Sequence, residues 1–152
     1  MPISGVSHIA VGVSDMETAL AFYCGVLGLE PFVDHVEDVV GIENVPTYQR
    51  RAVYLTWPGG REVRSFIVLD SQKRSAPLSP LTFNDMGTHH FAFTVDDMDE
   101  VMTRAKAAGA PVLIHPVAIT ADNPLNPTDV DARSAFIRDP DGNIIQLDEY
   151  AS

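Results

Sequence analysis

Two histidines stand at equivalent places in two similar stretches of the chain. Residues 5–11 read Gly-Val-Ser-His-Ile-Ala-Val and residues 87–93 read Gly-Thr-His-His-Phe-Ala-Phe, so His8 and His90 correspond at an offset of 82 residues (90 − 8). Neutral imidazole is a common ligand of zinc, nickel and iron. A lone histidine is more often a surface or core residue, but a related pair is typical of a shared site. His8 and His90 are therefore candidate metal ligands.

The residues around each histidine predict how it is positioned. Apolar side chains alternate with small or polar ones over residues 8–13 and again over residues 90–95, which is typical of a half-buried strand. Each histidine lies on the small or polar face, away from the apolar face that should pack on a helix. A helix is expected next, because Ser14–Glu17 has the spacing of a capping box and an apolar stripe at helical spacing runs to Gly28.

The correspondence extends beyond the histidines, because the offset of 82 recurs at two further places. Asp15-Met16 falls on Asp97-Met98, and Trp57–Gly60 falls on Asp139–Gly142. The chain therefore contains two copies of one module, about residues 1–75 and 84–152, with a linker over about 75–83. Each copy predicts a strand, a helix and three more strands, the later strands lying over 31–40, 52–56 and 64–70, and over 111–117, 135–138 and 143–150. This order predicts a single α+β domain of two βαβββ modules.

The order of elements and several motifs resemble the vicinal oxygen chelate superfamily. The matching motifs are His8-Ile9-Ala10-Val11, the helix end Phe22–Leu29, His90-Phe91-Ala92-Phe93 and the closing segment Phe136–Leu147. This superfamily includes glyoxalase I, methylmalonyl-CoA epimerase, extradiol dioxygenases, and fosfomycin and bleomycin resistance proteins. The resemblance implies a glyoxalase-like fold, in which an eight-stranded mixed sheet curls around a cup that can hold one divalent metal. It also implies a homodimer, and metal ligands from the first and last strand of each module.

Two of the ligand positions that the resemblance implies are not acidic in this chain. Gln146 stands where the family usually has Glu, and Val68, which cannot bind a cation, stands at the corresponding position of the first module. Glu149 has the parity of the apolar face, so only a β-bulge would make it a ligand. Asp70 and Asp148 have the parity of the cup, where they are expected to bind substrate, and Asp70 could also supply the missing acid. The predicted metal ligands are therefore His8, His90, Gln146 and Glu149.

Three more histidines and a group of arginines are candidates for the site. His35 and His115 end equivalent segments at an offset of 80, and they either line the mouth of the cup as acid or base groups or lie in solvent. His89 has the opposite parity to His90 and is predicted to point away from the cup. The arginines of the middle strands could bind a carboxylate or phosphate or be solvated; these are Arg50, Arg51, Arg61 and Arg64.

Charge and composition exclude several classes of protein. The chain has 152 residues with 10 Lys and Arg against 21 Asp and Glu, a net charge of −11 that disfavours binding to nucleic acids or anionic membranes. The single Cys24 excludes an intramolecular disulfide and a cysteine-rich zinc site. Neither a signal peptide nor an apolar run of about 18 residues is visible, so we expect a cytoplasmic protein that does not span a membrane.

These features predict an enzyme that acts on a small molecule through a divalent metal (zinc, nickel, manganese, cobalt or iron) bound to neighbouring substrate oxygens. A lyase or isomerase is favoured over a dioxygenase, because an iron site of two histidines and one carboxylate needs an acid that this ligand set lacks. The alternative is a metal-free protein that sequesters a ligand in the cup, as bleomycin resistance proteins do. Val68 and Gln146 favour this alternative, and the negative charge would suit a cationic drug. The sequence leaves open the substrate and whether modules pair within one chain or between two.

Overall fold

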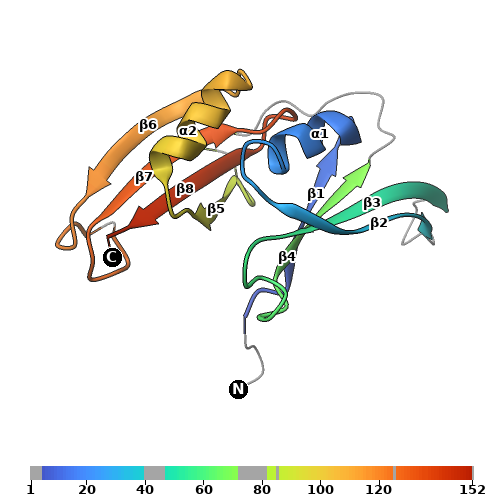
Figure 1. Cartoon of the computed structure of the whole chain (residues 1–152), viewed down its shortest axis with the longest axis horizontal. Helices are drawn as coiled ribbons and strands as arrows, with labels where there is room; N and C mark the ends of the chain where they lie inside the picture. Colours follow the sequence, from blue (N-terminus) through green and yellow to red (C-terminus); the bar gives the residue numbers. More distant parts are fainter. Residues whose placement is uncertain (1–4, 40–46, 72–81, 85, 125, 152) are drawn as a thin grey trace. The chain divides into compact units, whose positions relative to one another are not determined.

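The computed structural model describes residues 5–39, 47–71, 82–84, 86–124 and 126–151. The chain divides into two compact units, Met1–Pro77 and Leu78–Ser152, and most of the linker predicted over 75–83 lies outside the described residues. Within the described residues, each unit forms one helix and one four-stranded mixed sheet (Figure 1). The predicted α+β fold of two βαβββ modules is therefore confirmed.

The first unit places its first and last strands side by side. Its elements are β1 (His8–Val13), α1 (Met16–Tyr23), β2 (Glu30–Val39), β3 (Tyr48–Thr56) and β4 (Phe66–Ser71), and the sheet order is β1-β4-β3-β2. β1 and β4 pair in parallel, whereas the pairs β4–β3 and β3–β2 are antiparallel. Parallel strands need a long crossover, and α1, β2 and β3 provide it. As a result, His8 at the start of β1 lies beside Phe66 at the start of β4.

The second unit repeats this arrangement. Its elements are β5 (His90–Thr94), α2 (Met98–Ala107), β6 (Val112–Ile119), β7 (Ala132–Arg138) and β8 (Ile144–Tyr150), and the sheet order is β5-β8-β7-β6. β5 and β8 pair in parallel, with His90 beside Ile144. The strands are close to those predicted, except that β3 and β7 each begin earlier than their apolar segments indicated.

Both helices begin at an aspartate. Asp15 accepts a hydrogen bond from the backbone N–H of Thr18 at 2.8 Å, and Asp97 accepts one from that of Glu100 at 2.8 Å. The N-cap of α1 is therefore Asp15 and not Ser14, the residue that the capping-box spacing indicated. Asp15 and Asp97 correspond at the offset of 82. An acceptor at this position satisfies a backbone donor that the first helical turn leaves unpaired.

The first helix is shorter than its apolar stripe. α1 ends at Tyr23, and the Leu27 N–H then donates to the carbonyl of Phe22, five residues earlier, before Gly28 adopts a φ of +75°. A left-handed residue after the last turn is a common way for a helix to end. Neither α1, nor α2, nor any other helix in the described part of the chain is long and apolar enough to cross a membrane.

The core of each unit lies between its helix and one face of its sheet. α1 contacts β4, and α2 contacts β8. Burial alternates along β1, where Val11 and Val13 are buried and His8, Ala10 and Gly12 are exposed, so the predicted alternation is confirmed. The other fully buried apolar side chains of these layers include Val53, Ile67 and Leu69 in the first unit and Met98, Ile137, Ile145 and Leu147 in the second.

The same ion pair connects sheet and helix in both units. Arg51 on β3 binds Glu17 on α1 at 2.6 Å, and Arg133 on β7 binds Asp99 on α2 at 2.6 Å. Both partners correspond at the offset of 82 (133 − 51 and 99 − 17). Arg51 therefore serves the architecture of the module, and the side chains next to it along β3 point to the opposite face of the sheet.

Candidate functional site

Five of the predicted site residues lie on the face of each sheet that is turned away from its helix, which we call the distal face; they are His8, Asp70, His90, Gln146 and Asp148. Directly paired residues of neighbouring strands point to the same side of a sheet. The pairs on this face are His8–Phe66, Ala10–Val68 and Gly12–Asp70 in the first unit, and His90–Ile144, Ala92–Gln146 and Thr94–Asp148 in the second. Val68 and Gln146 are therefore structurally equivalent, as the sequence alignment of the two copies predicts.

His8 is exposed on the distal face, with one ring nitrogen hydrogen-bonded and the other available. Its ring stacks on Phe66, with centroids 5.1 Å apart and planes 10° from parallel. The Oγ atom of Ser7 lies 3.3 Å from Nδ1 of His8. Nε2 makes no hydrogen bond to any described residue, so this nitrogen is the one that can bind a metal or a substrate.

His90 has an equivalent environment, in which His89 replaces the serine. The Nδ1 atoms of His89 and His90 are 2.7 Å apart, and the two rings are in contact at 4.6 Å between centroids. Phe136 and Phe83 pack edge-on against His90 at 5.7 and 6.2 Å. Strand parity predicts that His89 points away from the cup, and it does not predict this contact with His90, because β5 begins only at His90 and strand alternation does not extend to the residue before it.

Gln146 is oriented by a buried aspartate. Its Nε2 donates to both carboxylate oxygens of Asp148, at 2.9 and 3.0 Å, and Asp148 also accepts a hydrogen bond from the hydroxyl of Ser134. Because the carboxylate can only accept, the amide nitrogen of Gln146 must face it and the amide oxygen Oε1 must face away. Asp148, which was expected to contact substrate, is thus the partner that directs the Gln146 oxygen.

Asp70 occupies the position of Asp148 but lacks its partners. Ala52 pairs with Asp70 as Ser134 pairs with Asp148, so the first unit has a methyl group where the second has a hydroxyl. One oxygen of Asp70 accepts from Arg50 at 2.7 Å, and the other, Oδ1, is buried without a hydrogen bond to any described residue. Withdrawal from water raises the pKa of Asp70, an effect that the charge of Arg50 opposes.

The position of Asp70 along its strand argues against its serving as a ligand beside His8. Asp70 pairs with Gly12, four residues beyond His8, which corresponds to about 13 Å along the strand. The ring of His8 stacks on Phe66, its own neighbour across the pair, and its charge has only a minor influence on Asp70. Asp70 is therefore a candidate for substrate contact, because its buried oxygen can accept a hydrogen bond.

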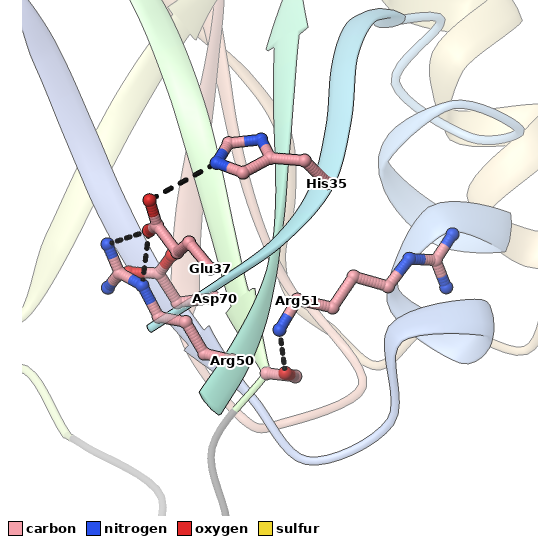
Figure 2. A network of polar contacts seen from close by, with 6 residues as sticks. His35, Glu37, Arg50, Arg51 and Asp70 are labelled. Carbon is pink, nitrogen blue, oxygen red and sulfur yellow. Dashed lines mark hydrogen bonds and ion pairs between the residues drawn. The ribbon is translucent and has the colours of Figure 1, made fainter. Parts of the chain in front are cut away.

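A chain of polar contacts leads from Asp70 to the edge of the first sheet (Figure 2). Arg50 binds Asp70 and Glu37, each at 2.7 Å, and Glu37 in turn lies 3.2 Å from Nε2 of His35. Figure 2 shows the side chains of Arg50 and Arg51 leaving β3 in opposite directions, with only Arg50 on the distal face. His35 therefore belongs to this network, which the sequence did not reveal because its members come from three strands.

The remaining candidates differ in their surroundings. His115, the predicted counterpart of His35, is exposed on the edge strand β6. Glu149 accepts from the backbone N–H of Met98 at 2.9 Å and binds Arg133 at 3.1 Å, so it faces α2. The pairing of β7 with β8 is regular from Ala132–Tyr150 to Arg138–Ile144, and the bulge that would bring Glu149 to the distal face is not formed.

Asp70 should make the stability of the protein depend on pH. Burial raises its pKa above the ordinary 3.8, so the folded protein holds this proton to a higher pH than the unfolded chain does. The resulting stability is present below pH 3.8 and is lost as the pH rises through the folded pKa. We expect Asp70→Asn to remove this component. Urea unfolding of the wild type and of Asp70→Asn from about pH 3 to about pH 7 measures this component. The same pH dependence of the unfolding free energy in both proteins would contradict the assignment.

The available donors fit a borderline divalent metal, but they are all neutral. The first unit offers the imidazole of His8, and the second offers the imidazole of His90 and the amide oxygen of Gln146. Imidazole suits zinc, nickel and iron. Among the described residues, no cluster of three or more His, Cys, Asp or Glu side chains could hold a metal ion.

Known structures share this fold. An integron cassette protein from V. cholerae is 24% identical with a TM-score of 0.60, over 99% of this chain and 98% of that one. A glyoxalase/dioxygenase from Nostoc punctiforme is 21% identical with a TM-score of 0.69, over 97% and 92% of the two chains. A mutant of the fosfomycin resistance protein FosX from Listeria monocytogenes, in complex with Mn(II) and 1S,2S-dihydroxypropylphosphonic acid, is 20% identical with a TM-score of 0.62, over 98% and 94%.

At these identities the structural matches show the fold alone. No curated protein sequence matches the chain. Residues 5–147 match the model of the Glyoxalase/Bleomycin resistance protein/Dioxygenase superfamily. The match covers both modules and includes the distal-face residues of the two strand pairs described above, except Asp148. The chain belongs to this superfamily, which confirms the resemblance to vicinal oxygen chelate proteins.

Proposed function

We propose that the protein is a small-molecule enzyme of the vicinal oxygen chelate type, in which His8, His90 and Gln146 hold one divalent metal ion. The observation that carries the proposal is the state of the two histidines. Each has Nδ1 engaged by the residue before it and Nε2 without a partner among the described residues. This is the arrangement in which metal-binding histidines are usually found, with the second nitrogen hydrogen-bonded.

Gln146 adds a third donor of the right kind. Its amide nitrogen is held by Asp148, which leaves Oε1 as the atom available to a cation. Three protein ligands with open positions are typical of catalytic metal sites, whereas structural sites are closed. Glu149 is not included, because its carboxylate is held by α2 and Arg133.

The distal face offers groups for the substrate as well. When bound, a divalent metal would polarise neighbouring oxygens and stabilise the anion that forms in a lyase or isomerase reaction. Phe66, Tyr54 and Phe136 provide aromatic surface for an apolar part of the substrate, since all three pack on the proposed ligands or on each other. The buried Oδ1 of Asp70 can accept a hydrogen bond or a proton from the substrate.

The ligand set argues for a lyase or isomerase over a dioxygenase. A non-haem iron oxygenase site uses two histidines and one carboxylate. In the described residues the nearby acids Asp148, Glu149 and Asp70 are engaged by Gln146, Arg133 and Arg50 respectively. The complex of FosX with Mn(II) supports the metal-dependent proposal, because that protein has the same fold.

The second candidate is a metal-free protein that sequesters a ligand, as bleomycin resistance proteins do. One observation favours it, namely that the two equivalent strand positions are Val68 and Gln146, so neither supplies an acid. Such a protein would have no use for two histidines with matched hydrogen bonds, and for this reason we place it second.

Metal content distinguishes the two candidates. Protein purified without chelator and without an affinity-tag metal should contain about one divalent ion for each pair of modules, and a strong chelator should remove it. The measurement is elemental analysis of the protein before and after dialysis against chelator. A protein without metal, which also takes up none of zinc, nickel, manganese, cobalt or iron(II), would support sequestration instead.

A further inference from the structure

We propose that Ser7 and His89 are positioning residues that hold the Nδ1 atoms of His8 and His90 and thereby present each Nε2 atom to the metal ion. The inference rests on the proposed function and adds to it the residues that prepare the ligands. Ser7 and His89 correspond at the offset of 82 (89 − 7). The same contact is thus made twice, by side chains of different chemistry at one position of the module.

The contact between His89 and His90 requires an ordered proton. Two δ nitrogens 2.7 Å apart must carry one proton between them, because two lone pairs or two N–H groups would repel each other. If His90 donates, its Nε2 is unprotonated and can bind a metal, and His89 accepts at Nδ1 while keeping a proton on its own Nε2. If His89 donates instead, the proton of His90 lies on Nε2 and blocks coordination. Metal binding therefore selects the first arrangement.

Ser7 can serve His8 in the same way. A hydroxyl oxygen has two lone pairs and accepts from Nδ1 without any change of its own proton. The distance of 3.3 Å is long for a hydrogen bond, and the pair is exposed. The His89–His90 contact is shorter and partly buried. Loss of His89 should accordingly weaken metal binding more than loss of Ser7.

Packing fixes the rings in the orientation that these contacts need. Phe83 lies edge-on to both His89 and His90, at 6.3 and 6.2 Å between centroids, and Phe136 completes the group at 5.1 Å from Phe83. His8 is held by its stack on Phe66. A metal site needs this support, since a hydrogen-bonded second nitrogen fixes both the tautomer and the ring orientation of a histidine ligand.

The test compares zinc affinities of the full chain in competition with a chromophoric chelator. We expect His89→Ala to lower the affinity about 10–100-fold, the usual effect of removing such a partner. His89→Asn places an amide oxygen near the site of Nδ1 and should stay within about threefold of the wild type. Ser7→Ala should lose less than about tenfold, and Ser7→Thr, which keeps the hydroxyl, should lose little.

Controls separate positioning from packing and from the loss of any histidine. His115→Ala removes an exposed imidazole and should leave the affinity unchanged. If His89 had a purely structural role, its replacement would lower the unfolding free energy of the metal-free protein, and the zinc affinities of His89→Ala and His89→Asn would not differ. Equal zinc affinities for the wild type, His89→Ala and His89→Asn would overturn the proposal.

The imidazole ¹⁵N spectrum tests the contact without relying on affinity. In the zinc-bound protein we expect His90 to be protonated at Nδ1 and His89 at Nε2. In the metal-free protein, in mildly alkaline solution where free imidazole is neutral, the two δ nitrogens should share one proton, and His89→Ala should abolish that signal. A wild type that binds no zinc overturns the proposed function, whereas a metal-free spectrum without the shared proton overturns the contact itself.

Discussion

His8→Ala and His90→Ala are each expected to lower the affinity for zinc by more than about 100-fold. Loss of a group that only hydrogen-bonds a metal ligand lowers the metal affinity about 10–100-fold. Loss of the metal-binding imidazole itself must lower the affinity more. Among the described residues, the acids Asp70 and Glu149 are held by Arg50 and Arg133 and so do not replace the missing imidazole. Titration with zinc followed by calorimetry or chelator competition measures the effect.

Both variants should remain folded, which makes the result interpretable. His8 is exposed, and its main contact is the stack on Phe66, so its truncation should change the unfolding free energy by less than about 1 kcal/mol. His90 is half-buried, and Phe83 and Phe136 remain to cover the position. Unchanged zinc affinity in either variant, with folding intact, would exclude that histidine from the metal site.

The repeated module explains why much of the fold could be predicted from the sequence. Strand alternation placed His8 and His90 on the face away from the helix, and the registers Ala10–Val68 and Ala92–Gln146 confirm the alignment of the two copies. These predictions depend on local periodicity, which each copy of the module shows separately. The first strand was predicted with the bounds that the structure has.

Charged contacts between strands account for what the sequence did not reveal. β3 begins at Tyr48 and not at Ala52, because Arg50 and Arg51 extend it through ion pairs on opposite faces. An apolar pattern cannot detect a strand stabilised in this way. The contact of His89 with His90 was likewise missed, because it depends on where β5 begins and not on the alternation within it.

The difference between Asp70 and Asp148 shows how a repeat can divide roles between its copies. Ser134 and Gln146 satisfy the carboxylate of Asp148, whereas Ala52 and Val68 at the equivalent positions leave an oxygen of Asp70 without a partner in the described part of the chain. A buried acceptor without a hydrogen bond costs about 1–3 kcal/mol. Its presence on the distal face is understandable if a substrate donor supplies the missing hydrogen bond.

Gln146→Glu is expected to destabilise the metal-free protein by about 1–3 kcal/mol. The substitution removes the two hydrogen bonds that Nε2 donates to Asp148 and places a second carboxylate beside a carboxylate that is only 9% exposed. Two such groups repel each other when both are charged. Ser134 is then the remaining side-chain donor to the carboxylate of Asp148 among the described residues.

Binding of a metal ion should restore the stability that Gln146→Glu loses. The carboxylate at position 146 would be an anionic ligand in a set that is otherwise neutral, and hard or borderline cations bind such a set more tightly. Zinc at about 100 times its dissociation constant adds about 2.7 kcal/mol to the unfolding free energy, so stability should return to about the level of the metal-free wild type.

Gln146→Ala is the matched control, because it also frees Asp148 but supplies neither a charge nor a ligand atom. Urea unfolding with and without zinc compares the three proteins at one pH. Under the metal-enzyme proposal, zinc stabilises the Glu variant most, the wild type less and the Ala variant least. The Glu variant has an anionic third ligand, the wild type has a neutral one, and the Ala variant has none. If zinc leaves all three curves unchanged, His8 and His90 do not form a metal site, and the neutral residues Val68 and Gln146 would then belong to a protein that binds its ligand without a metal.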